Sequence, residues 1–194
     1  MMVEVMVALL ISVIGLVGIT KLQHVAKNSN AQSVQRTIAS NLSNDFIERI
    51  RANKAGISTY FSSDNTTLRG TTAAPTQTCI STSKCTASEM ASYDIWEWEQ
   101  KLLGNLEQID ATNQATGGLV NPIVCLQRPA GGGAGIHHIA IAWHSQSKLA
   151  FNNTKIPNTN AANCGTAVAD GAYDSTGNDN VYRRIHWQEF YLDV

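Results

Sequence analysis

Residues 5–20 read VMVALLISVIGLVGIT and contain neither a charge nor a proline. An apolar run of this length can just cross the hydrocarbon core of a bilayer, which needs roughly 20 apolar residues in a helix. The only charge before Lys21 is the carboxylate of Glu4. Because a carboxylate at the centre of a membrane helix costs about 2.5–3.5 kcal/mol, Glu4 is a candidate functional residue. It lies near one end of the run, where it could meet a cation from a neighbouring subunit.

The helix is expected to continue far beyond this run, since neither proline nor turn chemistry interrupts the chain before residue 54. Apolar side chains fall in an arc roughly 160° wide on a helix. They are Ala31, Val34, Ile38, Ala39, Leu42, Phe46 and Ile50. The opposite side carries polar residues: Lys27, Asn30, Asn44, Glu48 and Arg51. The pattern predicts one helix over residues 2–52, roughly 75 Å long.

Two further features separate the N-terminal segment from an ordinary secretory signal or a simple anchor. It has neither a basic region before the apolar run nor a small-residue cleavage site after it. Gly15 and Gly18 lower the intrinsic stability of the helix and permit either close helix packing or local unwinding.

The composition predicts one exported domain after the long helix. Lys plus Arg number 14 and Asp plus Glu number 15, so the net charge of −1 does not indicate a nucleic-acid surface. Arg183 and Arg184 are too few to form one. About 140 residues follow residue 54, enough for one domain with its own core.

Four cysteines are present: Cys79, Cys85, Cys125 and Cys164. None forms a C-x-x-C pair, and the sequence alone does not choose among the three possible connectivities. The short loop between Cys79 and Cys85 makes their pairing easy, which leaves Cys125 for Cys164. Closing that longer loop should contribute about 4 kcal/mol on the chain-entropy model. The alternative is a metal site that combines cysteines with His137 or His138, but the spacing does not fit a zinc ribbon. Disulfides are therefore the prediction, with no metal.

A second helix is predicted in the head. Residues 54–86 are expected to form a loop, and Thr86-Ala-Ser-Glu89 is a capping box that starts a helix ending at about residue 103, before Gly104. Its buried face is expected from Met90, Tyr93, Trp96 (or Ile95) and Leu103. Trp96 and Trp98 could suggest a ligand site, but packing on the sheet and the long helix is the preferred interpretation.

The rest of the chain predicts strands. Residues 122–128 form a short strand, and the glycine-rich residues 129–135 form a hairpin turn, since they lack the ending of a phosphate-binding loop. Alternation in residues 139–144 predicts a half-buried strand. Residues 152–180 are expected to form a long loop tied down by Cys164, and residues 182–192 to form a closing strand.

No catalytic constellation is found, so neither an enzyme nor a cofactor is predicted. Four histidines lie on the predicted strands and are expected at the surface or at sheet edges: His137, His138, His144 and His186. A zinc site would need several of them to converge around an open position. No serine lies in a nucleophile-elbow motif, and no pair of carboxylates has a recognisable spacing.

Several motifs resemble one family. Residues 3–10, VEVMVALL, resemble the start of a type IV pilin just after its leader cleavage site. Residues 15–23 and residues 48–53, ERIRAN, resemble the PilV minor pilins. Residues 92–98, SYDIWEW, resemble the Tyr-Asp-x-Trp-x-Trp helix of that family. The opening motif would also fit secretion pseudopilins, whereas the later motifs favour PilV.

The resemblance implies an α+β type IV pilin fold, with a long N-terminal helix packed on a small antiparallel sheet and with disulfide-tied loops. Residues 1–24 would be the transmembrane and filament-core half of the helix, and residues 25–194 the periplasmic head. The implied function is assembly with other minor pilins to prime and cap a type IV pilus for twitching motility and adhesion. The implied partners are other minor pilins, the major pilin, the inner-membrane assembly machinery and a tip adhesin. The implied location is the inner membrane and then the pilus, at its tip.

The start of the chain departs from the family pattern. Prepilins carry a short basic leader that ends in glycine, and its removal exposes the residue that becomes the methylated N-terminus. Met1 lies three residues before Glu4, so translation is expected to begin upstream or the chain to have been trimmed. The resemblance implies that Glu4 pairs with the free N-terminal amine of a neighbouring pilin. Two alternatives remain: a minor pseudopilin of a type II secretion system, and a membrane-anchored pilin that binds a ligand or DNA.

Overall fold

The computed structural model describes residues 2–80, 84–109, 114–115, 117–148, 156, 158–166 and 182–193. The chain divides into two compact units, Met1–Val34 and Gln35–Val194. Helix α1 is Met2–Ala52, so the predicted long helix is confirmed at both ends. The other elements all belong to the second unit. In chain order they are η1 (Lys54–Gly56), α2 (Ile57–Tyr60), β1 (Asn65–Leu68), α3 (Ala87–Leu103), β2 (Gln108–Ile109), β3 (Gln114–Ala115), β4 (Ile123–Gln127), β5 (Gly135–His144), α4 (Thr159–Ala162) and β6 (Arg183–Leu192).

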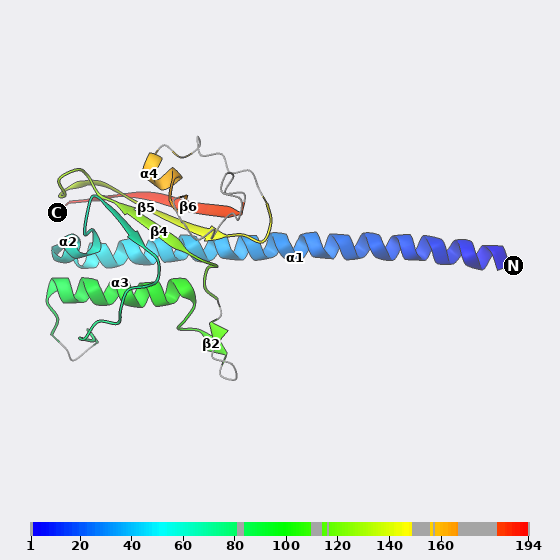
Figure 1. Cartoon of the computed structure of the whole chain (residues 1–194), viewed down its shortest axis with the longest axis horizontal. Coiled ribbons are helices and arrows are strands. Elements are labelled where there is room, and N and C mark those ends of the chain that lie inside the picture. Colours follow the sequence, from blue (N-terminus) through cyan, green and yellow to red (C-terminus); the bar gives the residue numbers. More distant parts are fainter. Residues whose placement is uncertain are drawn as a thin grey trace. The chain divides into compact units, whose positions relative to one another are not determined.

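The second unit is built on a four-stranded antiparallel sheet in the order β1-β4-β5-β6, and β2 pairs with β3 separately. Strands β5 and β6 pair from Gly135 opposite Leu192 to His144 opposite Arg183. Figure 1 shows α3 lying alongside the C-terminal part of α1, with the sheet over another side of that helix. The predicted α+β fold class is confirmed, as are the short strand, the hairpin turn and the closing strand.

The segment expected to be a loop over residues 54–86 contains structure, so that prediction is wrong in part. It holds η1, α2 and the edge strand β1. The sequence of β1 is NTTL, whose polar residues carry no clear alternating pattern. Its conformation comes from antiparallel pairing with β4, from Asn65 opposite Gln127 to Leu68 opposite Val124.

The core-facing stripe of α1 is confirmed in the second unit, where Ala39, Phe46 and Ile50 are buried. Ser43 and Ile47 widen the buried face beyond the predicted arc. Ser43 is satisfied there because its hydroxyl donates to Gln188 Oε1 over 3.1 Å. The predicted stripe does not stay buried toward the N-terminus, where Val34 is 50% exposed.

Helix α3 begins and ends as predicted but presents a different face. The Thr86 side chain accepts from the Glu89 backbone, the Glu89 side chain accepts from the Thr86 backbone, and Gly104 ends the helix at φ 73°. The buried residues are Ala91, Ile95, Trp98, Glu99 and Leu102. Of the residues expected on that face, only the alternative Ile95 is buried. Helix α3 turns the face that carries Trp98 toward α1, where the Trp98 indole N–H donates to the Leu42 carbonyl over 2.9 Å.

Strand β5 is buried on both faces, which corrects the prediction of a half-buried strand. Ile139 and Ile141 belong to the main core. Ala140 and Ala142 belong to a second cluster with Ala161 of α4. The second face is covered because residues 158–166 lie over it. The remainder of the predicted loop over residues 152–180 lies almost wholly outside the described residues.

Candidate functional site

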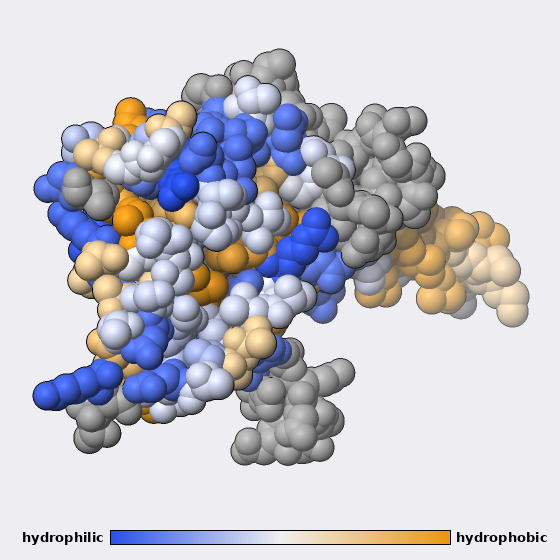
Figure 2. Space-filling model, turned by 60° about the vertical axis from the view of Figure 1, so that its left-hand side comes forward, coloured by the Kyte–Doolittle hydropathy of each residue, from blue (hydrophilic) through white to orange (hydrophobic). Residues whose placement is uncertain are grey.

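The N-terminal part of α1 exposes its apolar side chains on all sides. Large apolar side chains are 48–87% exposed from Met2 to Val25. By length and composition this part of the helix can cross a membrane. Its apolar surface is orange at the right of Figure 2. Exposed apolar patches larger than a few hundred Å² are rare on soluble monomers, so this surface is suited to contact with lipid or with other subunits.

The helix itself satisfies two of the polar side chains in this segment. The Ser12 hydroxyl donates to the Ala8 carbonyl over 2.8 Å, and the Thr20 hydroxyl donates to the Val17 carbonyl over 2.9 Å. These bonds matter in hydrocarbon, where no water is present to pair with a hydroxyl. Both hydroxyls are therefore compatible with a lipid environment or with the interior of a helical bundle.

The structure places Glu4 in the first turn of α1. Negative charge is favourable there, because the backbone N–H groups of a helix N-terminus carry a partial positive charge. A Cβ added at Gly15 or at Gly18 would meet no atom within 4 Å. The segment thus combines one carboxylate at its start with two positions where another helix could approach closely. The role of Glu4 in assembly remains a prediction.

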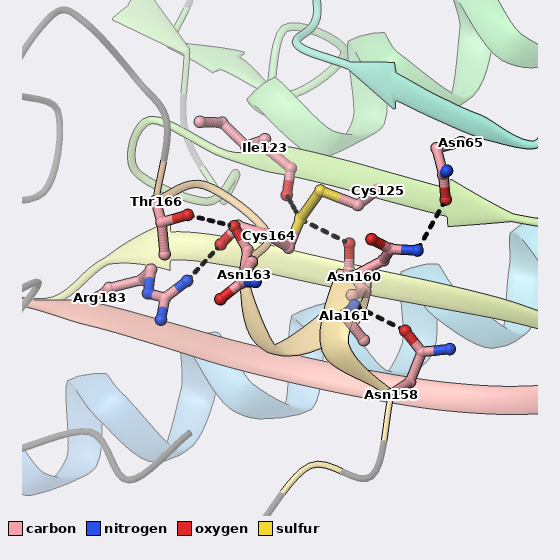
Figure 3. Close-up of a disulfide and its surroundings, with 11 residues drawn as sticks. Asn65, Ile123, Cys125, Asn158, Asn160, Ala161, Asn163, Cys164, Thr166 and Arg183 are labelled. Atoms are coloured by element: carbon pink, nitrogen blue, oxygen red, sulfur yellow. Dashed lines mark hydrogen bonds between the residues drawn. A yellow bond between two sulfur atoms is a disulfide. The ribbon is translucent and has the colours of Figure 1, made fainter. Parts of the chain in front are cut away.

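The head contains the disulfides Cys79–Cys85 and Cys125–Cys164, so all four cysteines are bonded. The Cys125–Cys164 bond attaches the segment around α4 to β4, across the sheet face that the second cluster covers (Figure 3). The Cys164 carbonyl also accepts from the buried Arg183 of β6 over 2.6 Å. One short segment is therefore held to two strands.

The histidines do not converge. His137 is fully buried, with its ring 5.0 Å from that of Phe61 and 5.6 Å from that of Phe190. Its Nδ1–H donates to the Gly135 carbonyl over 3.1 Å. Burial lowers its pKa, so His137 is a neutral core residue, and its expected place at the surface or an edge is wrong.

The other histidines on β5 and β6 occupy different surroundings. His186 lies on the core-facing side of β6, where burial and then the charge of Arg36 lower its pKa. His138 lies on the other face of the sheet, with Nε2 3.8 Å from the Glu189 carboxylate. Within the described residues, no three His, Cys, Asp or Glu side chains are grouped so that they could hold a metal ion.

A charged cluster that the sequence analysis did not anticipate joins α1 to α3. The Arg49 guanidinium lies 2.9 Å from Asp94, 2.7 Å from Glu97 and 3.3 Å from Asp45. The Tyr60 hydroxyl of α2 donates to the second oxygen of Asp94. We call these five residues the Arg49 clamp. The side chains of Arg49 and Asp94 are only 16% and 13% exposed.

The electrostatics of the clamp follow from this geometry. Burial alone would lower the pKa of Arg49, but its hydrogen bond to Glu97 and the three neighbouring carboxylates raise it overall. Burial, followed by the hydrogen bond to Asp94, raises the pKa of Tyr60. Arg49 is therefore charged and Tyr60 neutral at physiological pH, the states in which each donates its bonds. The only hint in the sequence was that Arg49 and Asp94 belong to two separate family-like motifs.

Residues 21–96 match the family model Tt1218-like, described as type IV pilin Tt1218. The match supports a type IV pilin. The matched residues include Arg49, Tyr60 and Asp94 of the Arg49 clamp. The long N-terminal helix, the four-stranded antiparallel sheet and the two disulfides fit the α+β pilin fold. Pilins are structural proteins that assemble with other pilus components. No curated protein and no solved structure matches the chain.

Proposed function

We propose that this pilin is a PilV-type minor pilin, which joins other minor pilins to prime and cap a type IV pilus. The observation that carries the proposal is the change of character along one uninterrupted helix. Helix α1 is apolar from Val5 to Ile19, its large apolar side chains are exposed up to Val25, and it is amphipathic and packed into a core from Ala39 onward. The first part suits lipid and then a bundle of pilin helices, whereas the second part holds a folded head.

The PilV assignment rests on the two motifs that form the Arg49 clamp. Residues 48–53 supply Arg49, and residues 92–98 supply Asp94 and Glu97. The two motifs are in contact through these ion pairs, which explains in structural terms why both occur in this chain. The partners that we propose are other minor pilins, the major pilin, the inner-membrane assembly machinery and a tip adhesin.

The proposed location follows the same division of the chain. Residues 1–24 would anchor the protein in the inner membrane, with the head of residues 25–194 in the periplasm. After assembly the pilin would lie at the tip of an extracellular pilus. The pilus would serve twitching motility and adhesion, and it would serve DNA uptake only through the complex as a whole.

Deletion and complementation in the native host test this proposal. Deleting the gene should lower the number of surface pili and the twitching zone, and a plasmid copy should restore both. An affinity-tagged copy should co-purify sibling minor pilins after cross-linking in membranes. Normal pilus number, together with co-purification of secretion pseudopilins, would contradict the proposal and favour a type II secretion system.

A further inference from the structure

The outer face of the sheet, opposite the main core, carries a row of polar side chains that crosses all four strands. Asn65 of β1 pairs in register with Gln127 of β4, Gln127 with His138 of β5, and His138 with Glu189 of β6. Residues paired in register lie on the same face, with Cβ atoms about 4.5–5.5 Å apart. Polar residues directly opposite one another on four adjacent strands form a continuous hydrogen-bonding surface.

A pocket of about 210 Å³ lies between this row and the segment of residues 158–166. The polar residues of its lining are amides, hydroxyls and one imidazole: Asn65, Thr66, Thr67, Gln127, His138, Asn160, Asn163 and Thr166. The remaining lining is small or apolar and includes Leu126, Ala161 and the Cys125–Cys164 bond. Among the described residues, the wall is therefore a hydrogen-bonding surface without a lysine, an arginine or a carboxylate.

The walls are held in place independently of any ligand. Asn160 Nδ2 donates to Asn65 Oδ1 over 3.0 Å, and Figure 3 shows the two amides pointing toward each other. Asn158 Nδ2 donates to Gln127 Oε1 over 2.6 Å, and the disulfide fixes the same segment covalently. A site whose walls are already ordered loses less entropy when a ligand binds.

In each of these side-chain amides the two bonds use either the nitrogen or the oxygen, but not both. Within the described part of the chain they leave the Asn65 and Gln127 amide N–H groups and the Asn160 carbonyl oxygen for further bonds, since each side-chain amide has two donors and an acceptor. His138 also lines the pocket and adds an imidazole to its wall. The pocket thus offers donors and acceptors side by side.

The charge of the surroundings selects the class of ligand. The Glu189 carboxylate at the end of the polar row disfavours an anion. Calcium and magnesium bind through oxygen ligands that usually include carboxylates, and no carboxylate of the part of the chain that the structure describes lines the pocket. Peptides are usually recognised through large apolar anchors or by strand pairing. The only large aliphatic side chain in the described lining, Leu126, belongs to the main core, so the described wall offers no pocket for such an anchor. Sugar hydroxyls both donate and accept, as do the amide, hydroxyl and imidazole groups of the wall.

We propose that this pocket binds one residue of a neutral carbohydrate. Asn65, Gln127 and Asn160 would form hydrogen bonds with the hydroxyls of the sugar. His138, which lies on the sheet, would form a hydrogen bond with a further sugar hydroxyl. The site belongs to the head alone and does not depend on the proposed role in pilus assembly. It would give the pilin a surface for neutral glycans in addition to its surfaces for other subunits.

The test uses the full chain in an amine-oxide detergent, because that headgroup contains neither sugar nor phosphate. Glucose, galactose, mannose and N-acetylglucosamine are titrated separately and followed by saturation-transfer difference NMR. Inorganic phosphate serves as the anionic comparison. At least one sugar should bind in the millimolar range and shift the imidazole resonances of His138, whereas phosphate should not. Binding of none of the four sugars, or of phosphate alone, would overturn the proposal.

Two variants and a control locate the site. Gln127→Leu and Asn160→Ala should each weaken sugar binding by about fivefold to tenfold, the loss expected for one hydrogen bond. Asn41→Ala removes an amide from the exposed face of α1 and should leave binding unchanged. Equal binding by all three variants would place the sugar elsewhere and refute the site. If a pocket variant fails to fold, the His138 shift in the unaltered protein decides the question by itself.

Discussion

The Arg49 guanidinium donates a hydrogen bond of 2.9 Å to the Asp94 carboxylate across a sequence separation of 45 residues. The bond joins α1 to α3, and the Tyr60 hydroxyl occupies the other carboxylate oxygen. Asp94 is consequently held by donors from two other helices. The clamp thus ties the helix that continues into the apolar segment to the rest of the head.

Replacing Arg49 by Met should destabilise the head by about 3 kcal/mol, because removing one partner leaves buried carboxylates without their cation. Arg51→Met is the matched control on the same helix. Arg51 lies 2.7 Å from Glu48, but the two side chains are 46% and 67% exposed. Exposed pairs contribute at most about 1 kcal/mol. Urea denaturation of the detergent-solubilised chain measures both, and equal losses would contradict a structural role for the clamp.

The two disulfides should differ in their contribution to stability. Cys125–Cys164 closes a separation of 39 residues and Cys79–Cys85 one of 6. On the chain-entropy model the first contributes about 4 kcal/mol and the second about 2 kcal/mol. Serine replacement of each pair, followed by thermal unfolding, should show the larger loss for Cys125 and Cys164. Peptide mapping under non-reducing conditions checks the pairing, and free thiols or a Cys79–Cys125 link would contradict it.

Stability should fall when the pH drops below about 6.5. Burial lowers the folded-state pKa of His137 and of His186, so the unfolded chain, with an ordinary histidine pKa, binds more protons in this range. Their contribution is therefore present above that pH and is lost as the pH falls toward their lowered folded-state pKa values. Glu89 and Asp193 also have lowered pKa values, but they titrate in a more acidic range.

His137→Phe tests the pH dependence, since a phenyl ring can keep the contacts with Phe61 and Phe190 without titrating. The variant should lose less stability than the unaltered protein between pH 7 and pH 5. His24→Gln, at an exposed position of α1, should keep the original slope. An unchanged slope in His137→Phe would show that the buried imidazole does not contribute.

The parts of the fold that could be predicted are those determined by residues close together in the sequence. No break interrupts α1, and both ends of α3 carry their own signals in Thr86, Glu89 and Gly104. The face of α3 was not predictable, because two sets of apolar residues fit a helical arc and only Trp98 against Leu42 decides between them. Strand β1 was missed because its pairing with β4, rather than its residues, makes it a strand.

The candidate sites show the same limit. The apolar segment and Glu4 can be recognised from one window of sequence. The Arg49 clamp could not be derived, because charged residues on a helix usually indicate a solvated face. The partners of Arg49 on α3, Asp94 and Glu97, lie 45 or more residues away in the sequence. The polar row across the sheet depends on the register of four strands, which hydrophobic patterning specifies only for the buried face.

Removing residues 1–25 should yield a soluble monomeric head. The deletion takes away the exposed apolar side chains from Met2 to Val25, and the remaining part of α1 keeps Phe46 and Ile50 for the core. Size-exclusion chromatography and circular dichroism measure the two outcomes. A fragment that stayed in the membrane fraction, or that showed no folded signal, would place the boundary between anchor and head elsewhere.

Replacing Glu4 by Ala should impair incorporation into the pilus and leave membrane insertion and head stability unchanged. In a filament the apolar helices pack together away from water, where a carboxylate is tolerated if it meets a cation such as the N-terminal amine of a neighbouring pilin. A low dielectric constant strengthens the attraction between the carboxylate and the amine, but it also raises the cost of desolvating both groups. The pair would therefore contribute little to the total affinity between subunits and would mainly fix how deep the subunit sits in the filament. A loss of about 1.4 kcal/mol at this step would reduce incorporation about tenfold.

Glu48→Ala is the control for Glu4→Ala, since it removes an exposed carboxylate from the same helix outside the apolar segment. Both variants are compared with the unaltered protein for membrane level, co-purification with sibling pilins and number of surface pili. Glu48→Ala should match the unaltered protein in all three measurements. Glu4→Ala should match it only in membrane level, because insertion depends on the apolar run and not on the carboxylate. Normal pilus number and co-purification in Glu4→Ala, in a strain that needs this protein for piliation, would refute the role of Glu4 in assembly.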